Sequence, residues 1–316
     1  MGYIYGPVPS RRLGSSLGID PVPMKTCNWN CVYCQLGRTS RLVRQRRPYV
    51  PATELLGELE ERLTAHRRGE IDWVTIVGSG EPTLNSEIGP LIEGVKRLTT
   101  IPVAVITNGS LLSDEEVRRE LRPADAVLPT LDAGNEELFR RINRPLRALT
   151  LERHLEGLRA FRREYNGFLW VEVMLVSGMN DGEEELLEIA KELRRIRPDR
   201  VDLSEPERPP VEPWVSPATH EGKLRALAIL GEVARVLPPT PQRYDFSSGS
   251  MEEAIADVIE RHPLPDEELR RQLPQGRREE IIAALQDGGR VQRVERYGRW
   301  FWTSSESSYG GTSREP

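Results

Sequence analysis

The sequence predicts an α/β protein, a partial (β/α)6 TIM-like barrel followed by a small winged-helix-like domain. Three observations support this. Short apolar runs alternate with charged amphipathic stretches through the middle of the chain, glycine-rich and polar motifs follow these runs, and a proline-rich break precedes a helical C-terminal stretch. Such alternation is typical of parallel sheets and barrels. The 316 residues suit one large domain and one small domain. We expect a barrel core at 1–237, a linker at 238–249, a winged-helix-like module at 250–303 and a disordered tail at 304–316.

Six strands are predicted, each followed by a helix. The strands are expected to end near residue 20 and to cover 73–77, 101–106, 126–131, 169–176 and 200–204; the helices are expected at 53–67, 86–98, 113–121, 150–164, 182–196 and 219–236. In the C-terminal module, helices are expected at 250–261, 265–273 and 276–287 and a β-hairpin at 290–302. Residues 143–145 are expected to form a solvated turn, and Asn180 and Asp181 to begin the next helix.

Composition places the chain among ordinary globular proteins. Apolar residues make up 38 % and 26 residues are glycine. No window holds ~18 apolar residues, so no membrane span is expected, and without an apolar leader at the N-terminus the expected location is the cytoplasm. The net charge is −5, but residues 1–53 carry eight basic residues against Asp20 alone. This basic edge indicates either an anionic ligand or substrate nearby or simply a solvated loop.

All three cysteines, Cys27, Cys31 and Cys34, lie within eight residues. An odd number of cysteines without a leader argues against disulfides. A closed zinc site needs four ligands, and the four histidines are distant in sequence, although folding could bring one close. An iron–sulfur cube held by three thiolates would keep one iron open for a substrate or cofactor. Zinc and iron–sulfur both remain open on the residues alone.

Two motifs give the chain a family resemblance. The C-x3-C-x2-C spacing, with Tyr33 before the third cysteine, resembles the radical S-adenosylmethionine (SAM) superfamily. The strand predicted at 73–77 ends in Gly78-Ser79-Gly80-Glu81-Pro82-Thr83, which resembles the Gly-Gly-Glu-Pro stretch of that superfamily, with Ser79 in place of one glycine. Radical SAM cores also resemble the six-unit partial barrel predicted above.

A subgroup resemblance rests on two further stretches, residues 6–14 and 107–110. With them, the chain resembles a subgroup of uncharacterised iron–sulfur oxidoreductases similar to the wybutosine-forming tRNA enzyme. The archaeal form of that enzyme uses a second cluster with three more cysteines. This chain has no further cysteines, so that reaction is not carried over.

The resemblance implies a ligand set. Cys27, Cys31 and Cys34 would hold a [4Fe-4S] cluster whose open iron chelates SAM, and Tyr33 would pack near the adenine. Further contacts are expected at the carboxyl ends of the strands, where barrel enzymes build their sites. The SAM amino group is expected at Gly78, Gly80, Glu81 and Pro82, its ribose or methionine end at Thr107 and Asn108, and its ribose or the substrate at Asp132. The last three residues could equally be helix caps or turn residues.

The implied activity is reductive cleavage of SAM to a 5′-deoxyadenosyl radical, which abstracts hydrogen from an unknown substrate. A donor such as flavodoxin or ferredoxin would supply the electron. RNA, a protein or a small molecule could be the substrate, and the basic edge favours RNA. No residue is assigned as a catalytic base. The alternative is a metal-stabilised, non-catalytic scaffold or nucleic-acid-binding protein.

Overall fold

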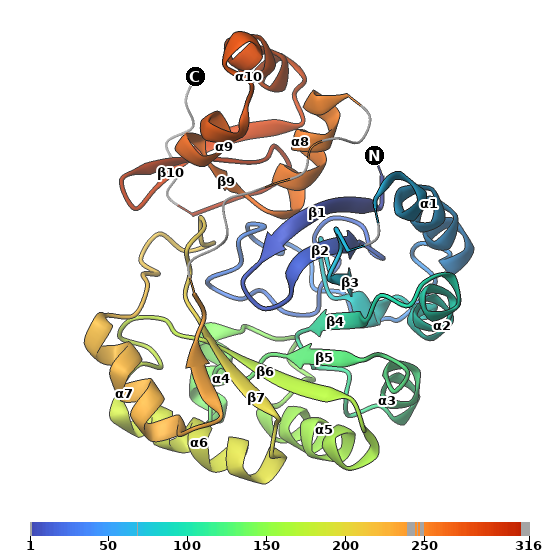
Figure 1. Ribbon diagram of the computed structural model, residues 1–316. Helices are drawn as coiled ribbons and strands as arrows, with labels where there is room; N and C mark the ends of the chain where they lie inside the picture. The colour runs from blue at the N-terminus through green and yellow to red at the C-terminus, as the bar shows by residue number, and fades with distance from the viewer. Residues whose placement is uncertain (1, 68, 239–243, 245, 247–249, 311–316) are drawn as a thin grey trace.

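An eight-stranded sheet forms the body of the molecule in the computed structural model, which describes residues 2–67, 69–238, 244, 246 and 250–310 (Figure 1). The strands lie side by side in sequence order. Strand β1 (Ile4–Ser10) is antiparallel to β2 (Gly14–Ile19), and every later neighbour pair is parallel. The remaining strands are β3 (Trp73–Ile76), β4 (Val103–Thr107), β5 (Ala126–Pro129), β6 (Phe168–Met174), β7 (Arg200–Ser204) and β8 (Ala234–Val236). The first and last strands are not paired with each other, so the sheet is an open, partial barrel.

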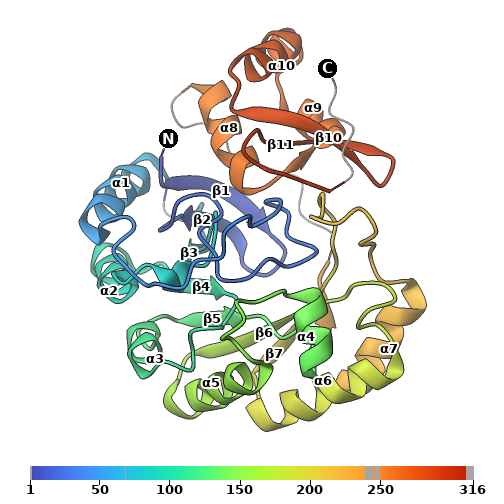
Figure 2. The ribbon, with the colours of Figure 1, turned by 180° about the vertical axis from the view of Figure 1, so that it is seen from behind.

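Helices cover the outer face of this sheet (Figures 1 and 2). They are α1 (Ala52–Ala65), α2 (Ile88–Leu98), α3 (Glu115–Leu121), α4 (Glu136–Ile142), α5 (Leu151–Glu164), α6 (Glu183–Ile196) and α7 (His220–Leu230), with a short 3-10 helix η1 (Pro82–Leu84) after β3. Parallel strands covered by helices are apolar along their length, and every residue of β5 is buried. The predicted α/β partial barrel is confirmed.

The structure corrects several predicted elements of the barrel. Strand β1 and helix α4 were not predicted. The helix expected at 219–236 ends at Leu230, because Gly231 adopts a positive φ of 80°, and β8 follows. Neither Asn180 nor Asp181 caps α6; the N-cap is Gly182, and the helix begins at Glu183.

The C-terminal module has a hydrophobic core of its own. It contains α8 (Met251–Arg261), β9 (Leu264–Pro265), α9 (Asp266–Gln272), the 3-10 helix η2 (Gln275–Arg277), α10 (Arg278–Asp287), β10 (Val291–Arg296) and β11 (Arg299–Ser304). The three helices and the hairpin lie where the sequence predicts them, and the short β9 completes a sheet in the order β10-β11-β9. The winged-helix assignment itself stays a prediction. In the expected linker, Tyr244 and Phe246 are buried in this second core; residues 239–243, 245 and 247–249 lie outside the described part of the chain.

The segment after β11 is packed, contrary to the predicted tail. Ser307 and Tyr309 are buried. The Tyr309 hydroxyl donates to the carbonyl of Gln35 at 2.6 Å, and the Ser307 hydroxyl donates to that of Leu36 at 3.0 Å. The prediction of disorder from residue 304 is therefore wrong for 304–310, and 311–316 lie outside the described residues. The serine and glycine content of this segment predicted disorder. Two of its side chains, Ser307 and Tyr309, are nevertheless buried and hold the segment on the cysteine loop.

The module packs against the β1–β2 edge of the barrel (Figures 1 and 2). Arg261 at the end of α8 pairs with Asp20 after β2, at 2.8 Å and with both side chains buried. None of the described helices combines the length and apolar character needed to cross a bilayer. The cytoplasmic location stays a prediction.

Candidate active site

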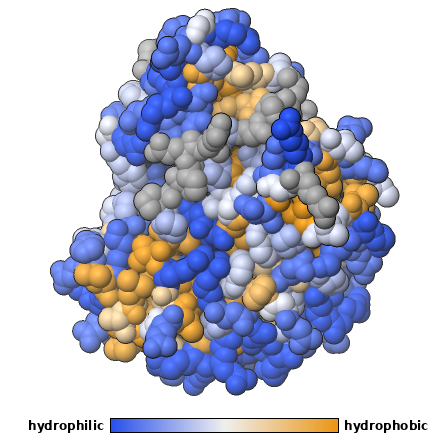
Figure 3. All heavy atoms as spheres, viewed as in Figure 1, coloured by the Kyte–Doolittle hydropathy of each residue, from blue (hydrophilic) through white to orange (hydrophobic). Residues whose placement is uncertain are grey.

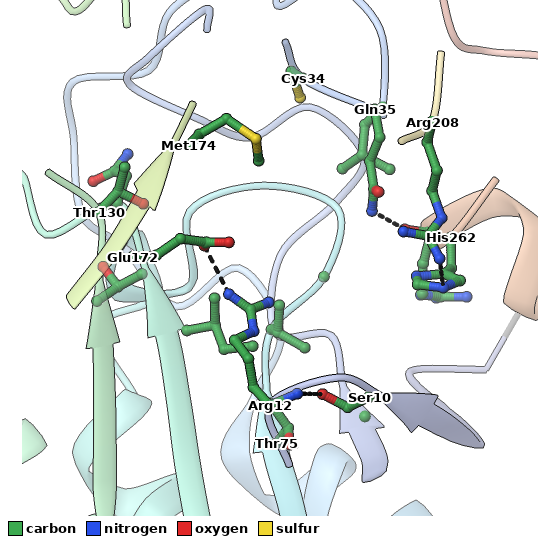
Figure 4. Close-up of a pocket in the computed structure, with 18 of the residues that line it drawn as sticks. Ser10, Arg12, Cys34, Gln35, Thr75, Thr130, Glu172, Met174, Arg208 and His262 are labelled. Carbon is green, nitrogen blue, oxygen red and sulfur yellow. Dashed lines mark hydrogen bonds and ion pairs between the residues drawn. The ribbon is translucent and has the colours of Figure 1, made fainter. Parts of the chain in front are cut away.

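A cavity of about 340 Å³ lies inside the partial barrel (Figure 4). Its walls come from the β1–β2 turn, the cysteine loop, the carboxyl ends of β3 and β4, strand β6, and Arg261 and His262 of the C-terminal module. Of the residues predicted for the site, the lining includes Cys27, Cys31, Cys34, Tyr33, Gly78, Gly80, Glu81, Thr107 and Asn108. Pro82 and Asp132 do not line it. The fold thus brings nearly the whole predicted set to one cavity.

Backbone hydrogen bonds hold the cysteine loop against the segment after α4. The Val32 amide donates to the Ile142 carbonyl at 2.9 Å, and the Asn30 amide to the Asn143 carbonyl at 3.1 Å. Asn143 is fully buried. The predicted solvated turn at 143–145 is therefore wrong, because the loop needs these carbonyls as acceptors.

Each thiol also accepts a hydrogen bond from a nitrogen. The Trp29 amide donates to Cys27 at 3.4 Å, the Asn143 side chain to Cys31 at 3.7 Å and the Lys25 ammonium to Cys34 at 3.3 Å. Such donors orient cysteine ligands and stabilise negative charge on sulfur. The environment is therefore built for thiolates.

Burial nevertheless disfavours free thiolates at this site. It raises the pKa of Cys27 to about 12, with the Glu81 carboxylate adding to the effect, and it raises the pKa of Cys31 well above its usual range. A bound cation reverses that penalty, because metal binding replaces the thiol proton. Among the described side chains, no three His, Cys, Asp or Glu converge on the position of a single ion. A four-iron cluster takes each thiolate on a different iron, so its ligands need not converge. The donor set fits a cluster of that kind.

The loop after β3 runs close beside the cysteine loop. A Cβ on Gly80 would lie 2.0 Å from the Thr26 carbonyl oxygen, so only glycine allows this approach. The Glu81 amide donates to the same carbonyl at 2.8 Å. Gly78 sits against Asp20, where a Cβ would lie 2.3 Å from the carboxylate. The glycines thus let two loops share one wall of the cavity.

Glu81 ties the ends of β3 and β4 together. Its buried carboxylate accepts from the Thr107 hydroxyl at 2.6 Å and from the Asn108 amide at 2.7 Å, as well as from Thr83. Burial raises its pKa. The Asn108 side chain then reaches the cysteine loop, donating to Asn28 at 2.7 Å. Glu81, Thr107 and Asn108 therefore form one network rather than isolated turn residues.

Ser79, the departure from the expected glycine, has a specific partner. Its amide and hydroxyl bond the Asp20 carboxylate at 3.0 and 2.5 Å. Asp20 also accepts from Arg261 at 2.8 Å. The loop is thereby connected to the C-terminal module through one buried carboxylate.

Tyr33 faces the cavity, but its hydroxyl is turned to Asp132, to which it donates at 2.5 Å. The Asp132 carboxylate also accepts from the Asn143 side chain at 2.6 Å and the Met174 amide at 2.8 Å. Burial raises its pKa to about 7. Asn180 donates to the Asp132 carbonyl at 2.9 Å. Asp132 therefore holds the Tyr33 hydroxyl from outside the cavity. The sequence had instead predicted that Asp132 lies in the site and contacts the SAM ribose or the substrate.

Comparison with known proteins assigns the family. The Radical SAM superfamily matches residues 22–193, more than half of the chain. The chain belongs to the radical SAM superfamily. Superfamily members use a [4Fe-4S] cluster and SAM, so this chain is a radical SAM enzyme with those cofactors.

Two curated proteins illustrate how far the similarity extends. UPF0026 protein MJ1312 of Methanocaldococcus jannaschii is 34 % identical over 98 % of this chain and 98 % of its own. A protein named GTPase Obg of Brachyspira hyodysenteriae is 46 % identical over 63 % of this chain, which spans only 29 % of that longer protein. Among solved structures, anSMEcpe with bound AdoMet has a TM-score of 0.50 at 17 % identity, covering 68 % of this chain and 58 % of its own. That likeness supports the fold.

Several residues that line the cavity were not predicted from the sequence. Arg208 and His262 contact each other across 54 residues of sequence, and Arg12 faces Glu172 across 160 (Figure 4). Nothing local marks such pairs. The basic N-terminal edge noted in the sequence includes Arg11 and Arg12, but its composition does not indicate that these two residues line the cavity.

Proposed function

We propose that Cys27, Cys31 and Cys34 hold the [4Fe-4S] cluster in this cavity and that SAM lies along the 78–83 loop and the end of β4. The observation that carries the proposal is the convergence of the three thiols, the glycine-tight loop and the Glu81 network on one cavity. When bound, the cluster supplies the electron that cleaves SAM to methionine and a 5′-deoxyadenosyl radical, which takes hydrogen from the substrate.

The protein's own residues position and shield that chemistry. Gly78 and Gly80 let backbone groups approach the SAM amino acid end. Thr107 and Asn108 are held by Glu81 at the neighbouring strand end, within reach of the ribose. Tyr33, braced by Asp132, offers a flat face for the adenine. Trp29 is 2 % exposed and closes the inner side of the cysteine loop against water.

The substrate supported by the charges is a small molecule rather than RNA. Half of the basic edge expected to attract RNA is paired with carboxylates: Arg11 pairs with Glu207, Arg12 with Glu172, Arg38 with Glu212 and Arg46 with Glu120. Arginines of the C-terminal module also pair with carboxylates, as Arg290 does with Asp257 and Glu260. The helix and strand order supports the winged-helix assignment for that module, with docking on the barrel as its role.

The reductant we propose is a small electron-transfer protein such as flavodoxin or ferredoxin. Arg41 and Arg44 are exposed on the stretch that follows the cysteines. Exposed cations beside the cluster loop would speed the approach of an acidic partner. With such a donor, the reaction rate should fall steeply as ionic strength rises, whereas the rate with dithionite, a small anion of low charge, should fall much less.

An anaerobic assay tests the function. The reconstituted protein is analysed for iron and sulfide, then mixed with SAM and dithionite, and 5′-deoxyadenosine is measured. We expect product from the wild type and from Gly57→Ala, whose site on α1 has open space around it, and none from Cys31→Ala. A protein loaded with zinc, or a cluster that never cleaves SAM, would contradict the proposal and favour the non-catalytic alternative.

A further inference from the structure

Three arginines line the cavity close to one another and to His262. Arg11 and Arg12 come from the β1–β2 turn, and Arg208 comes from the segment after β7. The side chains of Arg11 and Arg12 are 15 % and 19 % exposed. In Figure 4, Arg12 extends toward Glu172 of β6, and Arg208 lies beside His262. The cavity therefore has a basic end built from three separate parts of the chain.

The carboxylates at this end are each paired with a cation. Arg11 pairs with Glu207 and Arg12 with Glu172, each at 2.7 Å. The other nearby carboxylate in the lining, Glu205, pairs with Lys223 at 3.1 Å. Each acidic group here thus has its own cation.

Arg208 has no such counter-charge among its hydrogen-bond partners in the described part of the chain. It donates to the Pro263 carbonyl at 3.0 Å and contacts the His262 ring. Burial, together with the charges of Arg208, Arg11 and Arg12, lowers the pKa of His262 well below its usual range, so this ring is neutral. Glu268 and Arg208 both interact with Tyr244, but Glu268 does not line the cavity. Within the described lining, Arg208 is therefore the arginine of this end that has no carboxylate partner.

An unmatched guanidinium in a partly buried site favours an anion. Burial lowers the pKa of Arg11; Glu207 opposes this effect, whereas the neighbouring Arg208 and Arg12 add to it, so the three guanidinium groups lie close enough to repel one another. A carboxylate or phosphate would relieve this repulsion and accept paired hydrogen bonds, which suit the planar guanidinium.

The volume of the cavity limits the size of the molecule that bears the anionic group. A cavity of about 340 Å³ is at the lower end of the range for small-molecule sites. The C-terminal module closes one side through His262 and Arg261. With SAM in this cavity, the space that remains suits a small acid and not a folded macromolecule.

We propose that Arg11, Arg12 and Arg208 form an anion subsite that receives the carboxylate or phosphate group of a small substrate. This inference rests on the proposed function, since it places the substrate in the cavity assigned to SAM. It narrows the substrate class to small organic acids and phosphorylated compounds.

Anion binding to the reconstituted holoprotein with SAM, without reductant, tests the subsite. Inorganic phosphate and acetate are titrated calorimetrically at constant ionic strength, with acetamide as the uncharged comparison. We expect saturable binding of at least one anion, no binding of acetamide, and a loss of affinity of about ten-fold or more in Arg208→Gln. A response to phosphate alone indicates a phosphorylated substrate, and a response to acetate alone indicates a carboxylate.

Matched variants guard against a general charge effect. Arg97→Gln on α2 removes the same charge from a side chain that is 70 % exposed and should bind as the wild type does. Arg208→Lys keeps the charge and should recover part of the affinity; if Arg208→Gln does not fold, Arg11→Gln replaces it. The proposal is wrong if neither anion binds, or if Arg208→Gln and Arg97→Gln bind equally well. Production of 5′-deoxyadenosine by the wild type decides the proposed function separately.

Discussion

Asp20 and Arg261, 241 residues apart, form a buried ion pair whose side chains are 3 % and 4 % exposed. Asp20 follows β2 and also holds Ser79 of the loop assigned to SAM. Arg261 ends α8 and donates to the Gly2 carbonyl at 2.7 Å as well. The C-terminal module is therefore joined to the candidate SAM loop through a single carboxylate.

Replacing Arg261 should affect both stability and SAM binding. Arg261→Met leaves the Asp20 charge buried without its cation, and breaking a buried pair in this way costs about 3–5 kcal/mol. We expect a lower urea midpoint and a weaker SAM affinity, because the Ser79 loop loses its anchor. Arg97→Gln breaks only an exposed pair and should change the stability by less than about 1 kcal/mol. Equal behaviour of the two variants would show that the ion pair does not couple the module to the loop.

The close approach at Gly80 leads to a second prediction. Gly80→Ala places a Cβ against the Thr26 carbonyl, so the two loops must separate at a cost of about 1–3 kcal/mol. SAM affinity should fall about ten-fold or more. Gly57→Ala meets nothing within 4 Å on α1 and should stabilise the protein by about 0.5–1 kcal/mol. Calorimetric SAM binding and urea unfolding check both, and an unchanged SAM affinity in Gly80→Ala would remove this loop from the SAM site.

The parts of the site that the sequence predicted are those encoded in short segments. Cys27, Cys31 and Cys34 lie in one loop, and Gly78 to Pro82 follow one apolar strand, so these short motifs carried the family resemblance that predicted their roles. The strand ends of a parallel sheet meet at one edge, which brought Thr107 and Asn108 into the prediction. The structure adds the observation that these segments line the same cavity.

The parts that were missed depend on contacts between distant segments. Asn143 read as a turn residue, yet it is buried because the cysteine loop packs on it. Ser79 was interpreted as a departure from the family motif, yet its hydroxyl donates a hydrogen bond to the Asp20 carboxylate. Asp132 follows the carboxyl end of β5 as expected, but its side chain is oriented by Tyr33, 99 residues away, and by Asn143 after α4, a helix that was not predicted. Local composition carries no signal for such partners.

Tyr309 provides a test of the packed segment after β11. Its hydroxyl lies 2.7 Å from that of Thr303 and donates to the Gln35 carbonyl beside Cys34. Tyr309→Ala removes a buried ring at a cost of about 3 kcal/mol and should expose the cysteine loop, so a chelator should extract iron faster. Tyr309→Phe keeps the packing and should lose iron nearly as slowly as the wild type. Equal rates in all three proteins would mean that this segment does not protect the cluster.

His154 should make stability fall as the solution is acidified. The ring packs 5.4 Å from Trp29 and donates from Nε2 to the Thr130 carbonyl at 2.9 Å. Burial lowers its pKa from 6.5 to about 4, so between these values the unfolded chain binds the proton and the folded chain does not. The stability that the neutral ring contributes is fully present above pH 6.5 and is lost as the pH falls to 4, by roughly 3 kcal/mol.

His154→Gln can still donate to Thr130 but does not titrate, and its stability should fall less steeply over this range. Asp132, whose raised pKa acts in the opposite direction, is present in both proteins and cancels in the difference. Urea unfolding at pH 7, 6, 5 and 4 measures that difference, and parallel curves for the two proteins would contradict a buried, neutral His154.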